Sequence, residues 1–196
     1  IIQNDKNTDT VVYTSPEFQP CAETFSPAHY AFVGPSIRPA EKTMEKPGQP
    51  LVYVSLGTVV NDHPAFYRQC IAALAESPYR VILSVGEQLL HADLGALPEN
   101  IEAHAHVDQI AVLQIADVFL THCGMNSASE ALYFGVPLVM FPQTPEQGGV
   151  CARVLQLGAG MKLDKPEAAS IRKAIDDVFA SPAYREKAAE IAAGFG

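Results

Sequence analysis

The residues best suited to bind a ligand lie in the segment 117–130, which reads Asp-Val-Phe-Leu-Thr-His-Cys-Gly-Met-Asn-Ser-Ala-Ser-Glu. The pattern predicts a buried strand, a turn containing Gly124, and a helix opened by Asn126 and Ser127. Such a turn gathers free backbone N–H groups, a hydroxyl, an amide and the His122 imidazole at the positive end of a helix dipole. The segment is therefore a candidate phosphate site.

Two further loops carry polar groups after predicted strands. Ser55-Leu-Gly-Thr58 closes the first long apolar run and offers hydroxyls and amides, although an ordinary strand-to-helix turn looks much the same. Pro142-Gln-Thr-Pro145-Glu-Gln follows another such run, and its acid and amide suit sugar hydroxyls. The alternative is that Glu146 and Gln147 are simply the polar opening of the next helix.

Apolar runs alternate with helical patterns from about residue 50 onward. This alternation predicts an α/β fold with a doubly wound, parallel, Rossmann-like sheet, and ligands of such folds bind at the carboxyl ends of the strands. Residues 1–50 differ, because they hold seven of the fifteen prolines. Strands are expected at 51–56, 80–85, 101–104, 118–121, 138–141 and 160–163, with short β-like runs at 11–14 and 30–33. Helices are expected at 64–76, 109–116, 126–134, 148–157, 166–180 and 182–193.

Composition narrows the function classes. The 196 residues suffice for one substantial core, with 48% hydrophobic and 18% charged residues. The net charge of −9 argues against nucleic acid as a partner. No apolar run approaches the length of a membrane span, so we expect a cytoplasmic chain without membrane contact. Its four cysteines show no paired spacing and are expected to be free thiols.

The motifs from Asn100 to Gln147 together resemble the nucleotide-sugar-binding signature of family 1 glycosyltransferases, closest to bacterial macrolide-type UDP-glycosyltransferases. Thr-His-Cys-Gly-Met-Asn-Ser, Glu-Ala-Leu, Gly-Val-Pro and Pro-Glu-Gln follow in order, and weaker similarity reaches Glu17–Pro20, Phe32–Pro35 and Ser55–Thr58. The resemblance implies the GT-B architecture, in which two Rossmann-like domains face each other across a cleft. Residues 1–49 would then be the end of the acceptor domain and the inter-domain linker, and residues 50–196 the donor-binding domain.

The resemblance also implies roles for individual residues. His122 would neutralise a phosphate oxygen, Ser127 would contact the diphosphate, and Glu130 would accept hydrogen bonds from the two ribose hydroxyls. The alternative for Ser127 and Glu130 is a capping box, in which each side chain bonds a backbone amide at the helix start. Glu146 and Gln147 would hold the donor sugar. The predicted nucleotide-sugar-binding set is Ser55, Gly57, Thr58, His106, Val107, Gln109, His122, Gly124, Asn126, Ser127, Glu130, Glu146 and Gln147.

One stretch departs from the family pattern. The chain reads His106-Val-Asp-Gln109 where relatives usually carry Trp, Val, Pro, Gln, and it contains no Trp at all. In relatives that Trp stacks on the base. His106 either stacks less extensively, with Val107 backbone groups pairing the base edge, or is merely exposed. The choice between UDP and dTDP stays open.

The expected function is that of a donor domain in an inverting, metal-independent glycosyltransferase with no cofactor, acting on a small-molecule acceptor. The general base would belong to the acceptor-binding N-terminal domain, so this chain alone should bind nucleotide without catalysing transfer. Apolar surface near Gly194-Phe-Gly196 is expected to favour self-association. The alternatives are a nucleotide-sugar epimerase or hydrolase of the same architecture, or a degenerate nucleotide-binding module. No Walker or Gly-x-Gly-x-x-Gly motif indicates ATP or NAD chemistry.

Overall fold

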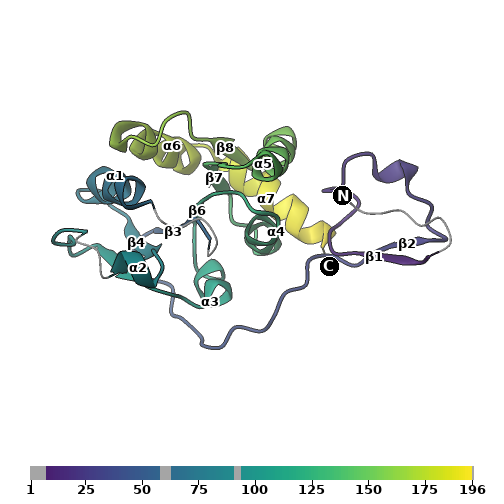
Figure 1. The fold of residues 1–196 in the computed structure, drawn as a ribbon, viewed down its shortest axis with the longest axis horizontal. Coiled ribbons are helices and arrows are strands. Elements are labelled where there is room, and N and C mark those ends of the chain that lie inside the picture. The colour runs from purple at the N-terminus through teal and green to yellow at the C-terminus, as the bar shows by residue number, and fades with distance from the viewer. Residues whose placement is uncertain (1–7, 58–62, 91–93, 196) are drawn as a thin grey trace.

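The computed structural model describes residues 8–57, 63–90 and 94–195. Its centre is a six-stranded parallel sheet (Figure 1). The strand order is β5-β4-β3-β6-β7-β8, the doubly wound arrangement of a Rossmann-type sheet, so the predicted fold class is confirmed. The strands are β3 (Leu51–Ser55), β4 (Arg80–Ser84), β5 (Ile101–His104), β6 (Val118–Thr121), β7 (Leu138–Met140) and β8 (Gly160–Lys162).

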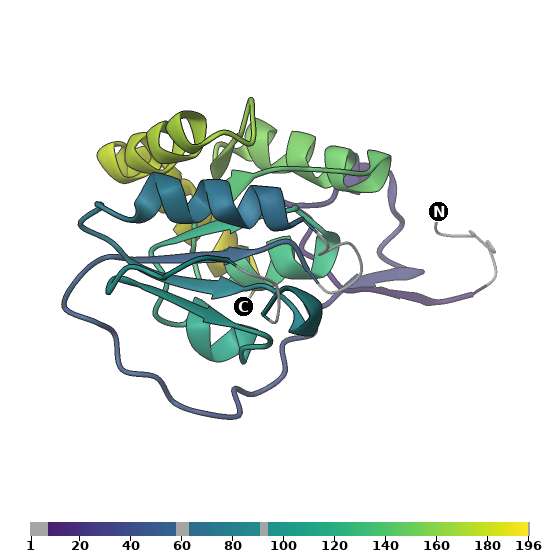
Figure 2. The same cartoon turned by 60° about the vertical axis from the view of Figure 1, so that its left-hand side comes forward.

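Helices cover both faces of this sheet (Figures 1 and 2). Alternate residues of each central strand enter two separate apolar cores: Val52 and Val54 face α1 and α6, whereas Leu51 and Tyr53 pack with α3, α4, α5 and α7. Burial on both faces explains why the strands read as continuous apolar runs. The helices are α1 (Pro64–Leu74), α2 (Glu87–Leu90), α3 (Gln109–Leu113), α4 (Met125–Tyr133), α5 (Pro145–Leu157), α6 (Ala168–Ala180) and α7 (Pro182–Gly194).

The point where the strand order reverses lies between β3 and β6. Ser55 pairs in register with Ser84 on one side and Thr121 on the other, so the three strands end at one level. The turns that follow them therefore meet at the carboxyl edge of the sheet. In open α/β sheets this crevice is where ligands bind.

Three helix starts differ from the sequence expectation, and in one of them α6 begins at Ala168 rather than at residue 166. Helix α4 begins at Met125 rather than Asn126, and α5 begins at Pro145 rather than Gly148. Proline is favoured in the first turn of a helix, and the Thr144 hydroxyl accepts a hydrogen bond from the Gln147 amide at 3.3 Å. The sequence also gave no indication of α2 or of the short 3₁₀ turn η1 (Ala22–Thr24).

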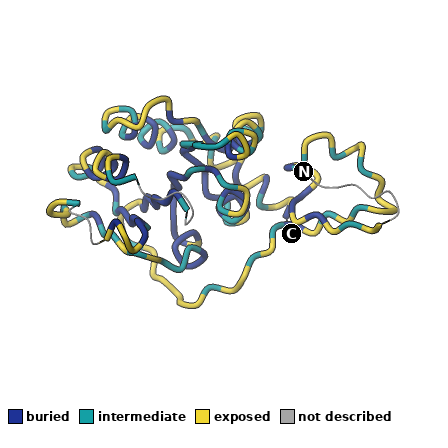
Figure 3. The backbone as a smooth tube through the Cα atoms, in the orientation of Figure 1, coloured by how far each residue is buried: buried dark blue, intermediate teal, exposed yellow. Residues whose placement is uncertain are grey.

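The residues before β3 form a separate small unit and a long connector. Strands β1 (Thr10–Val12) and β2 (Tyr30–Phe32) pair in parallel beside the end of α7 (Figure 1). The connector then runs across the domain with most of its residues exposed (Figures 2 and 3). The domain boundary at residue 50 stays a prediction.

The C-terminal apolar residue does not behave as the sequence suggested. Phe195 is buried, packs in the same core as Phe18, and its carbonyl lies against Gly34. Exposed apolar side chains are spread over the described chain, and three of them lie on and beside the two-stranded unit, at Val11, Tyr13 and Val33. The prediction of exposed apolar surface at residues 194–196 is therefore wrong for Phe195. Self-association stays a prediction.

Two features are absent from the described residues of the structure. None of the helices there combines the length and apolar character needed to cross a bilayer. No group of three His, Cys, Asp or Glu side chains there is placed to hold a metal ion.

Candidate functional site

A cleft of about 670 Å³ opens at the carboxyl edge of the sheet, where β3 and β6 end. The sequence-predicted residues converge on it from four separate segments. Thr58 lies outside the described residues, and every other member of the predicted set lines the cleft: Ser55, Gly57, His106, Val107, Gln109, His122, Gly124, Asn126, Ser127, Glu130, Glu146 and Gln147. The structure brings these groups together, and their role in binding stays a prediction.

His122 follows directly after β6, and its ring lies against two glycines. A Cβ atom added to Gly57 would come within 2.7 Å of the imidazole Cε1, and one added to Gly124 within 2.6 Å of Nε2. Both distances are too short for any real side chain. Gly57 also has a φ of +81°, a conformation that favours glycine. Gly124 therefore makes room for the imidazole, a reason that the sequence did not supply.

The turn around His122 is held by its own side chains. Cys123 adopts a left-handed φ of +64°, which is uncommon for a residue with a side chain. Its amide donates to the Thr121 hydroxyl at 3.2 Å, and its thiol is buried in the core. Such local strain clusters at functional sites, where the surrounding packing maintains it.

The environment of His122 favours the neutral imidazole. Desolvation is the largest influence and lowers the pKa of His122, while a hydrogen bond to the Ser55 backbone and the nearby Glu146 carboxylate oppose it without cancelling it. A neutral imidazole carries one N–H donor and one acceptor. In the free protein that N–H is donated to the Ser55 backbone carbonyl, so the ring donates into the cleft only when it gives up this bond or takes up a proton.

The N-terminus of α4 faces the same cleft and is not closed by a capping box. Gly124 is the N-cap residue, and the structure gives this helix start no side-chain cap hydrogen bond. Ser127 is the third helical residue and Glu130 lies a turn further on, so neither reaches back to the first amides. The capping-box alternative is therefore wrong. The first amides of α4 remain oriented toward the cleft at the positive end of the helix dipole.

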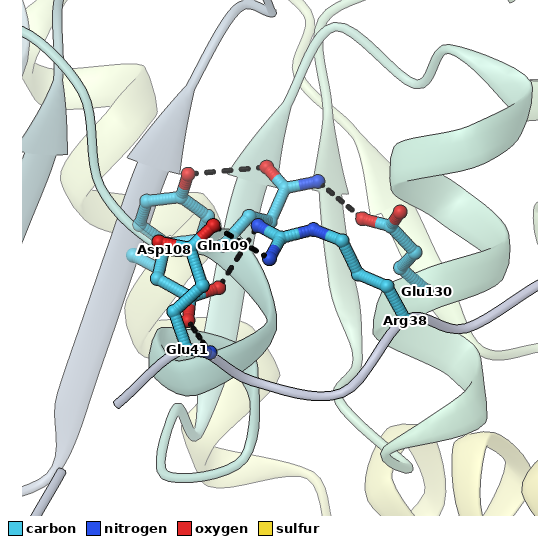
Figure 4. A network of polar contacts seen from close by, with 6 residues as sticks. Arg38, Glu41, Asp108, Gln109 and Glu130 are labelled. Carbon is cyan, nitrogen blue, oxygen red and sulfur yellow. Dashed lines mark hydrogen bonds and ion pairs between the residues drawn. The ribbon is translucent and has the colours of Figure 1, made fainter. Parts of the chain in front are cut away.

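Glu130 is held by a short chain of hydrogen bonds (Figure 4). The buried Tyr53 hydroxyl donates to Gln109 Oε1 at 3.1 Å, and Gln109 Nε2 donates to Glu130 Oε2 at 2.6 Å. Because the tyrosine proton requires an acceptor, it fixes the Gln109 amide with its NH₂ group toward Glu130 and Ser127. Gln109 thus orients a carboxylate at the cleft wall, and Tyr53 is a participant that the apolar strand pattern concealed.

Asp108, just before α3, binds residues of the connector. Its side chain is 9% exposed, and it accepts from Arg38 Nη2 at 3.0 Å and from the Glu41 backbone amide (Figure 4). Desolvation by itself would raise the pKa of Asp108, but the Glu41 amide, the Ala111 amide and Arg38 outweigh it and hold that pKa below its usual value. A residue at the start of α3 thereby fastens the connector to the cleft.

The first turn of α5 forms the far wall. Glu146 is exposed there, whereas Gln147 is buried and its Oε1 accepts from the Gln143 amide at 2.8 Å. Both residues do open the helix, as the alternative interpretation held, and both still line the cleft. Of the two, Glu146 is the more accessible to a ligand.

Other lining residues had no signal in the sequence. Arg38 comes from the connector, 70 residues before Asp108, and nothing in its surroundings marks it as part of a site. Thr144 contributes as the N-cap of α5. The remaining unpredicted lining residues are Leu56, Ser84, Gly86, Ala105, Ile110 and Met125.

Comparison with known proteins identifies the family. The model of the erythromycin biosynthesis protein CIII-like C-terminal domain matches residues 68–195. The chain belongs to this family. The resemblance noted in the sequence is thereby confirmed, and the match runs from within α1 to the end of α7.

Relatives of this family domain are named as glycosyltransferases. An uncharacterized UDP-glucosyltransferase, YojK of Bacillus subtilis, is 36% identical over 189 residues, which is 93% of this chain and 46% of the relative. Demethyllactenocin mycarosyltransferase of Streptomyces fradiae is 40% identical over 147 residues, covering 73% of this chain and 32% of that protein. The chain thus spans half or less of the length of these relatives.

A solved glycosyltransferase structure has the same fold. The calicheamicin glycosyltransferase CalG4 superposes with a TM-score of 0.87 at 39% identity, covering 95% of this chain and 49% of that one. The six-stranded parallel sheet therefore matches the C-terminal half of a GT-B glycosyltransferase. These relatives do not favour the epimerase or hydrolase alternative, nor a degenerate module.

Proposed function

We propose that this chain is the donor-binding domain of an inverting family 1 glycosyltransferase, which transfers a sugar from UDP- or dTDP-sugar to a small-molecule acceptor. One observation carries the proposal. The neutral His122 imidazole, the uncapped start of α4 and the Glu130 carboxylate meet in one cleft at the reversal point of the sheet. The relatives' names supply the reaction class.

The diphosphate would lie between the β3 and β6 turns. There the first amides of α4 and the Ser127 hydroxyl would donate to its oxygens, and the His122 ring would add a further N–H once it takes up a proton beside the charged diphosphate. Because backbone amides, a hydroxyl and an imidazole N–H stabilise negative charge locally, the overall charge of −9 does not prevent binding. The same donors would stabilise the charge that develops on the leaving diphosphate, so the proposed route requires neither a metal nor a cofactor.

The ribose and sugar would lie on either side of the diphosphate. Glu130 Oε2 accepts from Gln109, which leaves Oε1 and the remaining lone pairs to accept from a ribose hydroxyl. The exposed Glu146 and the neighbouring Gln147 line the opposite wall, where donor-sugar hydroxyls would be recognised. Val107 would offer backbone groups to the base edge.

The chemical step would be displacement at the anomeric carbon. An acceptor hydroxyl loses its proton to a general base, its oxygen bonds to the anomeric carbon, and the nucleoside diphosphate leaves. We assign the base and the acceptor pocket to an N-terminal acceptor-binding domain of the longer protein. The 196-residue chain alone should therefore bind nucleotide and transfer no sugar.

Isothermal titration of the purified chain with UDP, dTDP, UDP-glucose and ADP tests the proposal. We expect a pyrimidine diphosphate to bind more tightly than ADP, and both His122→Ala and Ser127→Ala to weaken that binding. His29→Ala is the matched control, because His29 is an exposed histidine on the N-terminal unit. Equal affinity for ADP and UDP, or binding unaffected by His122→Ala, would overturn the assignment.

A further inference from the structure

The cleft has one cationic wall residue that comes from outside the sheet domain. Arg38 lies on the connector, and its side chain crosses toward the start of α3 beside Gln109 (Figure 4). Its Nη2 donates to Asp108 at 3.0 Å and its Nη1 lies 3.3 Å from Glu41 Oε1. The side chain is still 51% exposed. Both ion pairs use in-plane N–H groups, so they leave the faces of the guanidinium free.

The cleft needs a flat surface for a nucleobase, and few described side chains supply one. The chain contains no Trp. Among the aromatic rings that line the described part of the cleft, Tyr53 is buried in the sheet core and His122 is enclosed by Gly57 and Gly124. The remaining flat groups in the described part of the cleft are the exposed His106 ring and the Arg38 guanidinium. A guanidinium plane stacks on aromatic rings, and arginine planes stack on unpaired bases in nucleic-acid complexes.

We propose that Arg38 is a nucleobase-binding residue of the donor site and that Asp108 is its positioning residue. This inference rests on the proposed function. Asp108 Oδ1 accepts from Arg38 Nη2 and its Oδ2 accepts from the Glu41 amide, while Glu41 Oε1 accepts from Arg38 Nη1, so the two carboxylates together orient the guanidinium. The connector thus contributes to the donor site and is more than a tether. In this account the planar guanidinium of Arg38 stacks on the base, where a Trp indole would otherwise do so.

Titrations with three probes separate the parts of the site: UDP, uridine and inorganic pyrophosphate. Arg38→Ala should weaken UDP and uridine by about five- to tenfold, the range of a cation–π contact, and leave pyrophosphate affinity unchanged. Asp108→Asn should weaken UDP by a smaller factor in the wild type. In the Arg38→Ala background it should have no further effect, because its influence acts through Arg38. Lys173→Ala, which removes an equal charge from the exposed face of α6, is the control.

The outcomes distinguish this inference from the proposed function. If wild-type chain binds neither UDP nor pyrophosphate, the proposed function fails and the inference with it. If UDP binds and Arg38→Ala leaves uridine affinity intact, the function stands and the inference is wrong. If Arg38→Ala weakens pyrophosphate as much as UDP, Arg38 contacts the diphosphate and the base assignment is wrong. A thermal unfolding midpoint close to that of wild type confirms that each variant is folded.

Discussion

The two edges of the central sheet are both polar, but they use their polar groups in opposite ways. At the amino edge Asp117 is almost fully buried, and its carboxylate accepts from Lys46 at 2.7 Å, Arg185 at 2.6 Å and the Leu51 amide at 2.9 Å. At the carboxyl edge the start of α4 has no side-chain cap, and the donors around it face a cleft.

The difference between the two edges shows how a binding site can be distinguished from a structural cluster of polar groups in the same fold. Each edge has a hollow, of about 670 Å³ at the carboxyl edge and about 480 Å³ at the amino edge. Size alone would not decide between them. At the amino edge, opposite charges satisfy one another and join the connector, the sheet and α7. At the carboxyl edge, donors point at a space that a ligand would fill, so we expect mutations there to affect binding and mutations at the amino edge to affect stability.

The largest expected effect is on ligand binding at the carboxyl edge. His122→Ala removes a hydrogen-bond donor to a charged diphosphate, a contact of about 1.5–3 kcal/mol, so UDP affinity should fall by about 10- to 150-fold. Because the ring borders the cleft, the free energy of unfolding in urea should change much less. Loss of stability without loss of affinity would contradict the contrast between the edges.

The converse change is Asp117→Ala at the amino edge. It leaves the buried Leu51 amide without its acceptor and separates two cations from their partner, so we expect a loss of about 1–3 kcal/mol in the free energy of unfolding. The dissociation constant for UDP should stay the same at a temperature where the variant is folded. Asp177→Ala, which removes a carboxylate from an exposed pair on α6, is the control and should change stability by less than about 0.5 kcal/mol.

A smaller effect tests the glycines that enclose His122. Gly124→Ala places a methyl group within 2.6 Å of the ring, so the ring must move and UDP binding should weaken by about tenfold, or 1.4 kcal/mol. In the His122→Ala background the same substitution should have almost no effect, because the clash is with the ring itself. Gly149→Ala is the matched control, since nothing lies within 4 Å of its added methyl group. Additive losses in the double variant would show that Gly124 acts independently of His122.

The smallest effect is on the pH dependence of stability. The pKa of His122 is lowered by desolvation, so the unfolded chain binds this proton more readily than the folded chain. Stability contributed through His122 should therefore fall as pH decreases through the range just below its ordinary value of 6.5. Subtracting the curve for His122→Gln from that for wild type should isolate this fall. A difference that grows as pH falls would mean that the folded protein favours the charged ring.

The strands, the fold class and most of the cleft could be predicted from the sequence because the information is local. Buried parallel strands read as unbroken apolar runs, and the residues directly after them must lie at the carboxyl edge. His122, Gly124 and Ser127 were placed correctly for that reason. The capping box was not, because it depended on Ser127 being the N-cap residue of the helix, and Gly124 occupies that position.

Contacts between distant segments could not be predicted in this way. Arg38 meets Asp108 across 70 residues, and Gly57 meets the His122 ring across two strands, so neither leaves a periodic pattern. Tyr53 looked like any other apolar strand residue, yet its hydroxyl sets the orientation of Gln109. In each case the deciding fact is which side chains the fold brings together.

The most direct test of the contrast between the edges is a ¹H–¹⁵N correlation spectrum of the 21.1 kDa chain during titration with UDP. We predict that the amides of Gly57, Gly124 and Asn126 shift with a common dissociation constant, while those of Leu51 and Val118 at the amino edge stay in place. Shifts centred on the amino edge, or no shifts at any UDP concentration, would contradict the assignment of the donor site to the His122 cleft.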